Sequence, residues 1–362
     1  MNRLFRWDQM GLFLLALAAG ILPFAVPEVC AAALREGLTL CSGPLLLSLF
    51  PFLVVSRLLI QCPESDLLAL PFRLAAWGIG IHTPCAARVL CIGFLGGFAP
   101  AASAAAQAVR TGQLTAEEAD ALLPACICSG PSFVVLTVGQ SLLGSAELGV
   151  LLFASQITAN YLTAALLNRF AGVRSVKPGS AAPASPAPPR LDEILADAAI
   201  TYCKLCGFIL FFRMLAAGAG ALLPAGAGAL CSILLEVCSG CDLAAKSGRF
   251  ASMLCCAALS VQGLSVLMQV RTICPPEMTL RPLYRARLLH LPLSLLLFYL
   301  LLPQRAQETF STLCGRVTMM RRLPPDCALL VFLGCCFVVC ELSRVLAKEP
   351  NQTQRDKVAN QS

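Results

Sequence analysis

Long apolar runs, each close in length to the thickness of a bilayer, follow one another along most of this chain. Short polar stretches separate the runs, and most of the Lys and Arg residues gather in these stretches. A helix needs roughly 20 mostly apolar residues to cross the hydrocarbon core, and about seven or eight runs approach that length. The pattern predicts an all-α integral membrane protein, a multi-pass helical bundle.

The first run, about Gly11–Val26, follows Arg3 and Arg6, as the apolar core of a signal peptide would. No small-x-small cleavage pattern precedes Glu28, and many further runs follow. We therefore expect a first spanning helix in preference to a cleaved leader.

Several apolar runs are interrupted near their centres by Gly, Pro or Ser, which disfavour a continuous helix. The interrupted runs are Leu38–Ile60 at Gly43 and Pro51, Cys85–Val109 at Gly96–Pro100, Ala121–Leu143 at Ser129–Pro131, Ala225–Ala245 at Cys238–Asp242, and Phe250–Val270 at Gln262 and Gly263. The other expected helices are Leu67–Ile81 in the membrane interface, Leu148–Leu167, Leu191–Tyr202, Cys206–Leu223, Leu288–Leu302 and Cys327–Leu346. We expect broken or re-entrant helices at the interruptions.

The runs divide the chain into two membrane halves. Residues 1–168 form the N-terminal membrane repeat and residues 193–347 the C-terminal one, with a polar tail at 348–362. Residues 169–192 between them are rich in Pro, Ala and Ser, a composition that cannot bury a core and predicts a flexible or extended linker. Basic residues flank the linker, which favours a cytoplasmic position.

The two halves carry the same features in the same order. Arg57 follows a Phe-containing apolar stretch in the first half, and Arg213 does so in the second. A Gly-rich break comes next in each half, and a Gly-x-Ser motif then interrupts a later run, at Gly130–Ser132 and at Gly263–Ser265. The spacings differ, so the pattern predicts two inverted structural repeats, one with an insertion.

The breaks are the predicted functional site. Backbone amides freed by a broken helix must be buried in protein or line a cavity, and paired broken segments in transporters meet near the midplane, where helix N-termini attract anions. The predicted backbone and hydrogen-bonding residues of this site are Gly96, Gly97, Gly130, Ser132, Gly240, Gln262, Gly263, Ser265 and the nearby Gln269. The alternative is that these small residues only let helices pack closely.

Four charged residues lie within apolar runs, where a charge is costly unless it is paired or hydrated. They are Arg57, Arg213, Glu236 and Asp242. A guanidinium binds a carboxylate through two parallel hydrogen bonds, so two arginines at repeat-equivalent positions predict a site for a solute with two anionic groups. Glu236 or Asp242 would orient an arginine or couple to protons. The alternative is that each arginine reaches the membrane interface or pairs with one of these acids.

Composition narrows the classes of function. The chain is 57% hydrophobic and 13% charged, against about 25% charged in soluble domains, so the lipid bilayer is its expected surroundings. Its net charge of +7 forms no basic stripe with interleaved aromatics, and no nucleic-acid partner is predicted. Most of the 20 cysteines lie in apolar runs, and only two histidines occur, so no metal or cofactor is predicted. Phosphate-loop, nucleophile-elbow and zinc-protease motifs are missing from the sequence, which predicts no enzyme.

Five motifs, taken in order, resemble the YlbJ-type sporulation integral membrane proteins, within the nucleoside-recognition (Gate) domain group related to concentrative nucleoside transporters. The motifs are Phe50-Pro-Phe52 with Arg57-Leu-Leu59, Gly93-Phe-Leu-Gly-Gly-Phe-Ala-Pro100, Cys128-Ser-Gly-Pro-Ser-Phe133, Leu235-Glu-Val-Cys-Ser-Gly240 and Gln262-Gly-Leu-Ser-Val-Leu-Met-Gln269. The resemblance covers roughly Gly11 to Leu302. Where many relatives carry Gly-x-Pro-x-Gly-Ala, this chain has Gly97-Phe-Ala-Pro-Ala-Ala102, which reduces local backbone freedom.

The resemblance implies a transporter that moves dipicolinate into the forespore during sporulation, located in the outer forespore membrane. Dipicolinate is a planar aromatic dicarboxylate, which suits the predicted arginine site. We therefore expect alternating-access transport of a small anionic aromatic solute by a monomer or a homo-oligomer. Transport of nucleosides or another metabolite is one alternative, and a non-transporting sporulation membrane scaffold is the other.

Overall fold

A computed structural model describes residues 7–171 and 190–302, and these residues form helices and no strands. The first half contains α1 (Trp7–Ala25), α2 (Pro27–Ser42), α3 (Pro44–Gln61), the 3-10 helix η1 (Pro63–Asp66), α4 (Leu70–Gly78), α5 (Pro84–Gly96), α6 (Phe98–Arg110), α7 (Ala116–Cys126), the π-helix η2 (Ser132–Leu142) and α8 (Ala146–Ala171). The second half contains α9 (Leu191–Leu222), α10 (Ala225–Leu235), α11 (Val237–Ala244), the 3-10 helix η3 (Gly248–Phe250), α12 (Ala251–Val261), α13 (Gly263–Ile273) and α14 (Arg281–Leu301). The predicted helix Cys327–Leu346, the tail and most of the predicted linker lie outside the described residues.

The described residues contain five helical segments long and apolar enough to cross a membrane, or six if the bent pair α1–α2 counts as one span. The five are Pro44–Gln61, Ala146–Ala171, Leu191–Leu222, Gly248–Ile273 and Arg281–Leu301. The helical multi-pass prediction is therefore confirmed, although the number of spans in this part of the chain is lower than the seven or eight runs suggested. The difference arises because several apolar runs are divided into helices too short to count as spans, and because the predicted run Cys327–Leu346 lies outside the described residues.

Most predicted breaks occur where the sequence places them. The chain turns between α5 and α6 at Gly97, where φ is +81°, and between α12 and α13 at Gln262, where φ is +62°. Residues 127–131 interrupt the run between α7 and η2, just before the π-helix begins at Ser132. Glycine and proline at these points remove either a side chain or a backbone donor, so the continuous helical ladder stops there.

Two local predictions are wrong. The break predicted at Cys238–Asp242 lies earlier, at Glu236, because the Glu236 carboxylate caps the N-terminus of α11 and the residues after it are helical. The interruption predicted at Pro51 does not occur, because Pro51 lies inside the continuous helix α3. The predicted run Leu191–Tyr202 continues directly into Cys206–Leu223 as one helix, α9, of 32 residues.

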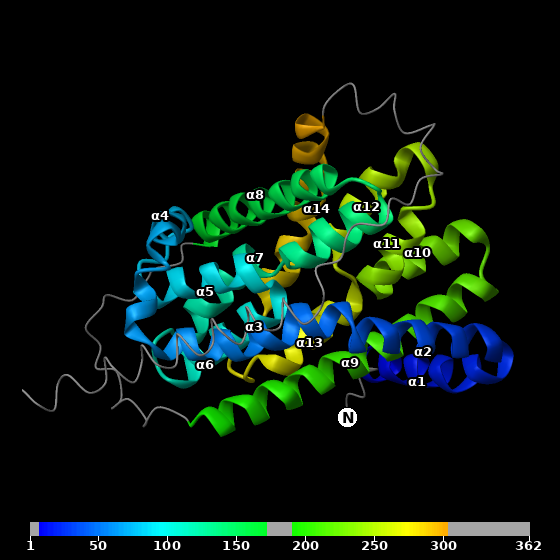
Figure 1. Cartoon of the computed structure of the whole chain (residues 1–362), viewed down its shortest axis with the longest axis horizontal. Helices are drawn as coiled ribbons and strands as arrows, with labels where there is room; N and C mark the ends of the chain where they lie inside the picture. The colour runs from blue at the N-terminus through cyan, green and yellow to red at the C-terminus, as the bar shows by residue number, and fades with distance from the viewer. Residues whose placement is uncertain (1–6, 172–189, 303–362) are drawn as a thin grey trace, which may run out of the picture. The chain divides into compact units, whose positions relative to one another are not determined.

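Two short hairpins follow from the breaks. Helices α5 and α6 pack against each other on either side of Gly97, and α10 and α11 do so on either side of Glu236. In Figure 1 the α5–α6 hairpin lies towards the left of the view and the α10–α11 hairpin towards the right. The long helix α9 runs past both halves and packs on α2, α3, α10 and α13 (Figure 1).

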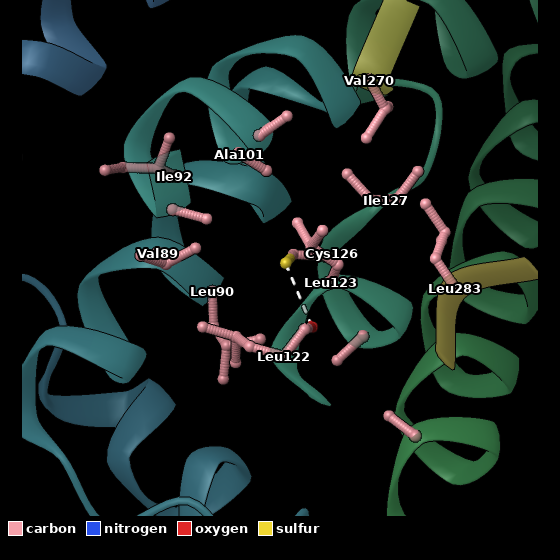
Figure 2. Packing of buried hydrophobic residues seen from close by; sticks show 14 of the residues in the cluster. Val89, Leu90, Ile92, Ala101, Leu122, Leu123, Cys126, Ile127, Val270 and Leu283 are labelled. Carbon is pink, nitrogen blue, oxygen red and sulfur yellow. Dashed lines mark hydrogen bonds between the residues drawn. The ribbon is translucent and has the colours of Figure 1, made fainter. Parts of the chain in front are cut away.

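The main core joins elements from both halves of the chain. Figure 2 shows side chains from α5, α6 and α7 packed towards Val270 of α13 and Leu283 of α14. Cysteines behave here as small apolar residues: Cys126 is 2% exposed, and its thiol donates to the Leu122 carbonyl oxygen at 3.3 Å (Figure 2). The core holds the ends of α7 and α12 in place, and these are the helices that stop at breaks.

Local capping fixes where α7 begins. The Thr115 hydroxyl accepts from the Glu118 amide at 3.1 Å, and the Glu118 carboxylate accepts from the Thr115 amide at 3.1 Å. This reciprocal pair is a capping box, and such a cap stabilises a helix start by about 1 kcal/mol.

Candidate functional site

Each hairpin tip packs against the broken helix that follows it in the chain. At the α5–α6 tip, a Cβ atom added to Gly97 would lie 2.6 Å from the Gly130 amide nitrogen. At the α10–α11 tip, a Cβ atom added to Gly263 would lie 2.9 Å from the Glu236 amide nitrogen. Backbone therefore meets backbone at both places, and only glycine leaves enough room.

Three of the four breaks, at Gly97, at residues 127–131 and at Glu236, and helix α13, which follows the fourth break at Gln262, surround one small cavity of about 50 Å³. We call it the break pocket; its walls come from Leu45, Ser48 and Leu49 of α3, Gly96 and Phe98 at the first tip, Ser129, Gly130, Ser132 and Phe133 at the second break, Ile209 of α9, Glu236, Val237 and Cys238 at the other tip, and Val266 and Gln269 of α13. Breaks that lie far apart in the sequence, in both halves of the chain, are therefore neighbours of the same cavity.

Glu236 is the acidic group of the break pocket. It is 1% exposed, and its carboxylate accepts from the amides of Cys238 at 2.8 Å and Ser239 at 2.7 Å. These amides form the positive N-terminal end of α11, where a carboxylate is stabilised. The protein's own side chain therefore occupies the anion-attracting end of this helix.

Arg213 lies beside Glu236 in a charge cluster in which these two side chains are buried, whereas those of Glu36 and Asp242 are partly exposed. Its Nη2 donates to Glu36 at 2.9 Å and to Asp242 at 2.8 Å, and its Nη1 lies 4.0 Å from a Glu236 carboxylate oxygen. Three carboxylates thus face a single guanidinium, which is 7% exposed. The interpretation that Arg213 pairs with Asp242 is confirmed, and Glu36 is a partner that the sequence did not indicate.

Arg57 lies in a different place, in a second cavity of about 160 Å³ that we call the cationic cavity. Its Nη1 forms an ion pair with Asp197 of α9 at 2.5 Å. Asp197 and Arg213 are both on α9, and a separation of 16 residues corresponds to roughly 24 Å along a helix. The two arginines therefore do not grip one small dianion, and the predicted two-arginine geometry is wrong.

A buried arginine that the sequence analysis missed joins the second and fourth breaks. Arg287 of α14 donates to the Ile127 carbonyl at 2.8 Å and to the Ser260 carbonyl at 3.4 Å. These carbonyls lie at the C-terminal ends of α7 and α12, which carry partial negative charge. Gln262 also donates to the Ile127 carbonyl, at 3.3 Å. Arg287 and Gln262 therefore hold the two broken helices together behind the break pocket.

A stripe along α14 was the available signal for Arg287. Its buried residues Leu283, Arg287, His290, Ser294 and Phe298 recur at intervals of three or four, which is the spacing of one helix face. The predicted helix begins at Leu288, one residue after Arg287, whereas α14 begins at Arg281 and includes it.

The predicted site residues thus divide into groups. Those that line the break pocket are Gly96, Gly130, Ser132, Glu236 and the nearby Gln269. Those that shape the breaks without lining it are Gly97, Gln262, Gly263 and Ser265, whose hydroxyl accepts from Gln269 at 2.9 Å. Gly240 lies within helix α11, where a Cβ atom would approach the Ile233 Cα atom at 3.0 Å, so it serves packing between α10 and α11. Arg213 and Asp242 belong to the charge cluster, and Arg57 belongs to the cationic cavity.

Comparison with known proteins found no matching family model, no matching curated protein and no matching solved structure. The resemblance to the sporulation proteins therefore stays a prediction.

Proposed function

We propose that this chain is a membrane transporter for a small anionic aromatic solute, with the break pocket as its central site. Dipicolinate is the solute that the sequence resemblance implies, and the outer forespore membrane is then the location. The observation that carries the proposal is that three helix breaks, from both halves of the chain, and the helix that follows a fourth break lie around one cavity. Irregular backbone at membrane depth is tolerated where it is buried in protein or lines a cavity.

The proposal includes two inverted repeats. In each half a hairpin tip, at Gly97 or at Glu236, packs on the break of the following helix, at Gly130 or at Gly263. Sites of this kind in secondary transporters lie at the interface between repeats, and access alternates by movement of one repeat against the other. The shared order of hairpin and broken helix supports this architecture.

The size of the break pocket supports a closed conformation. Ligand cavities are commonly about 300–1,000 Å³, whereas the break pocket encloses about 50 Å³. A ring-shaped solute therefore needs the two tips to separate before it enters. The rings of Phe98 and Phe133 in its wall suit an aromatic solute, and three cationic side chains of the adjoining cationic cavity suit an anionic one.

Glu236 favours a second candidate, a neutral solute rich in hydroxyl groups, such as a nucleoside. A carboxylate in the pocket wall accepts hydrogen bonds from hydroxyl donors and repels anions. Glu236 also neutralises the N-terminus of α11 that would otherwise attract an anion. The Glu236 carboxylate therefore favours binding of the neutral solute and disfavours binding of the anionic one.

Uptake into proteoliposomes separates the candidates. Wild type, Glu236→Gln and Glu36→Gln are assayed with radiolabelled dipicolinate and with uridine, under imposed proton, sodium and potassium gradients. For an anionic solute, Glu236→Gln takes up dipicolinate at least as fast as wild type, because a repelling charge is gone. For the nucleoside candidate, wild type takes up uridine and Glu236→Gln loses most of that uptake.

Glu36→Gln is the matched control, because it removes another carboxylate partner of Arg213 from outside the break pocket. It keeps wild-type preference between the two solutes. Uptake of neither solute by well-folded wild type, under every gradient, contradicts the proposal and favours the scaffold alternative.

A further inference from the structure

The cationic cavity is separate from the break pocket and lies where several helices end. Its wall includes Arg57 near the end of α3, Arg110 at the end of α6, Lys204 in the first half of α9, and Thr272 at the end of α13. Its volume, about 160 Å³, is about three times that of the break pocket. In this conformation it is therefore the larger of the two neighbouring cavities.

Charge in the cationic cavity is unbalanced. Arg57, Arg110 and Lys204 contribute three positive charges, and Asp197 contributes one negative charge. Asp197 accepts from Nη1 of Arg57 and leaves Nε of Arg57 buried without a hydrogen-bond partner among the described residues. A buried donor without a partner is costly, so Arg57, which lines this cavity, keeps a hydrogen-bond donor that the described protein leaves unused.

Gln269 adds an acceptor to the same cavity. It is 1% exposed, its amide nitrogen donates to Ser265, and its Oε1 has no partner among the described residues. Gln269 lines the break pocket as well as the cationic cavity. A single side chain therefore forms part of both walls, so the two cavities are neighbours.

The volume sets the size of the ligand. An apolar cavity of about 150 Å³ holds a benzene molecule, so about 160 Å³ is enough for one six-membered ring. The cavity is open at one side, and substituents can extend through that opening. Three cations around such a space suit one or two carboxylates on the ring.

We propose that the cationic cavity is a binding site for a ring-sized carboxylate anion, and that the transported solute docks there before it enters the break pocket. The second part rests on the proposed function, whereas binding in the cavity does not. Arg57 contributes its free Nε–H, and Arg110 and Lys204 attract the anion from solution. Gln269 accepts from any donor on the ring and leads towards the break pocket.

Equilibrium binding of radiolabelled dipicolinate to full-length protein tests the site without requiring transport. The protein is held in nanodiscs of phosphatidylcholine, and isophthalate, benzoate and pyridine serve as competitors with two, one and no carboxylates. The test variant is Arg110→Gln/Lys204→Gln, whose two side chains are exposed and so leave the fold intact. Arg281→Gln/Arg285→Gln removes the same charge from exposed positions outside both cavities.

We expect dipicolinate to bind wild type saturably. Its affinity should be at least tenfold lower for the test variant and within twofold of the wild-type affinity for the control variant. Competition falls in the order isophthalate, benzoate, pyridine, and added NaCl weakens binding because it screens the cations. In proteoliposomes, the test variant raises the KM for uptake and leaves the maximal rate within twofold.

Three results would overturn the inference. One is the absence of anion binding to wild type, and another is equal affinity in the test and control variants, even where uptake proceeds. The third combines two observations. Phosphatidylglycerol in the nanodiscs abolishes binding of the anion to wild type, and the test variant retains less bound phosphatidylglycerol than wild type does. Together these would identify the occupant of the cavity as a lipid headgroup. Cavity-dependent binding without any uptake would instead support the binding site and contradict the proposed function.

Discussion

Replacing Gly97 by alanine tests whether the first hairpin tip is held against the second break. Gly97 has φ +81° and ψ −162°, a backbone conformation that is essentially restricted to glycine. A Cβ atom there would also lie 2.6 Å from the amide nitrogen and 2.8 Å from the Cα atom of Gly130. Both neighbouring atoms are backbone, so neither yields by rotating a side chain.

The expected cost has two parts. Forcing a residue other than glycine into this conformation costs about 1–3 kcal/mol, and overpacking against rigid neighbours costs about 1–3 kcal/mol more. Gly144 has φ +73° with no atom within 4 Å of an added Cβ, so Gly144→Ala is a control for the cost of a positive φ without close contact. Gly207 lies inside α9 with open space around it, and Gly207→Ala should be neutral or stabilising by up to about 1 kcal/mol.

The assay is the apparent melting temperature of detergent-purified protein, measured by size-exclusion chromatography after heating at a fixed rate. The expected order is Gly97→Ala lowest, then Gly144→Ala, then wild type, with Gly207→Ala at or above wild type. Dipicolinate uptake by Gly97→Ala should fall further than its folded fraction, because the displaced tip distorts the break pocket. Equal apparent melting temperatures of Gly97→Ala and Gly144→Ala would refute the close approach of Gly97 to Gly130.

Two further predictions concern charge in the protein interior. Arg213→Met removes the cation that faces buried Glu236, whereas Glu36 and Asp242 are 65% and 37% exposed and stay hydrated. The variant should therefore destabilise the protein by about 1–3 kcal/mol. Asp242→Asn should cost less because Arg213 keeps Glu36, and melting temperatures in the reverse order contradict the cluster. Arg287→Lys keeps the charge, but an ammonium group cannot bridge the two carbonyls as the planar guanidinium does. Its melting temperature should therefore lie between those of wild type and Arg287→Met. Full recovery of stability by the lysine variant would show that charge alone, and no bridge, matters at this position.

The arginines show the limit of arguing from sequence order. Arg57 and Arg213 occupy matching positions in the two halves, and the sequence predicts that they act together. Their partners, Asp197 and Glu36, come from segments 140 and 177 residues away in the chain. No local pattern selects such partners, because they depend on which faces of α2, α3 and α9 meet.

The sequence by itself determined the membrane class, the helices and most of the breaks, because hydrophobic length and the backbone properties of Gly and Pro act within a few residues. It misplaced the break at Glu236, where a side chain caps a helix in competition with the glycine that follows. Only the tertiary structure decided which breaks meet, which arginine bridges the ends of α7 and α12, and that two cavities share Gln269. These features follow from long-range packing, in which backbone and charged groups far apart in the chain satisfy one another once lipid and protein have excluded water.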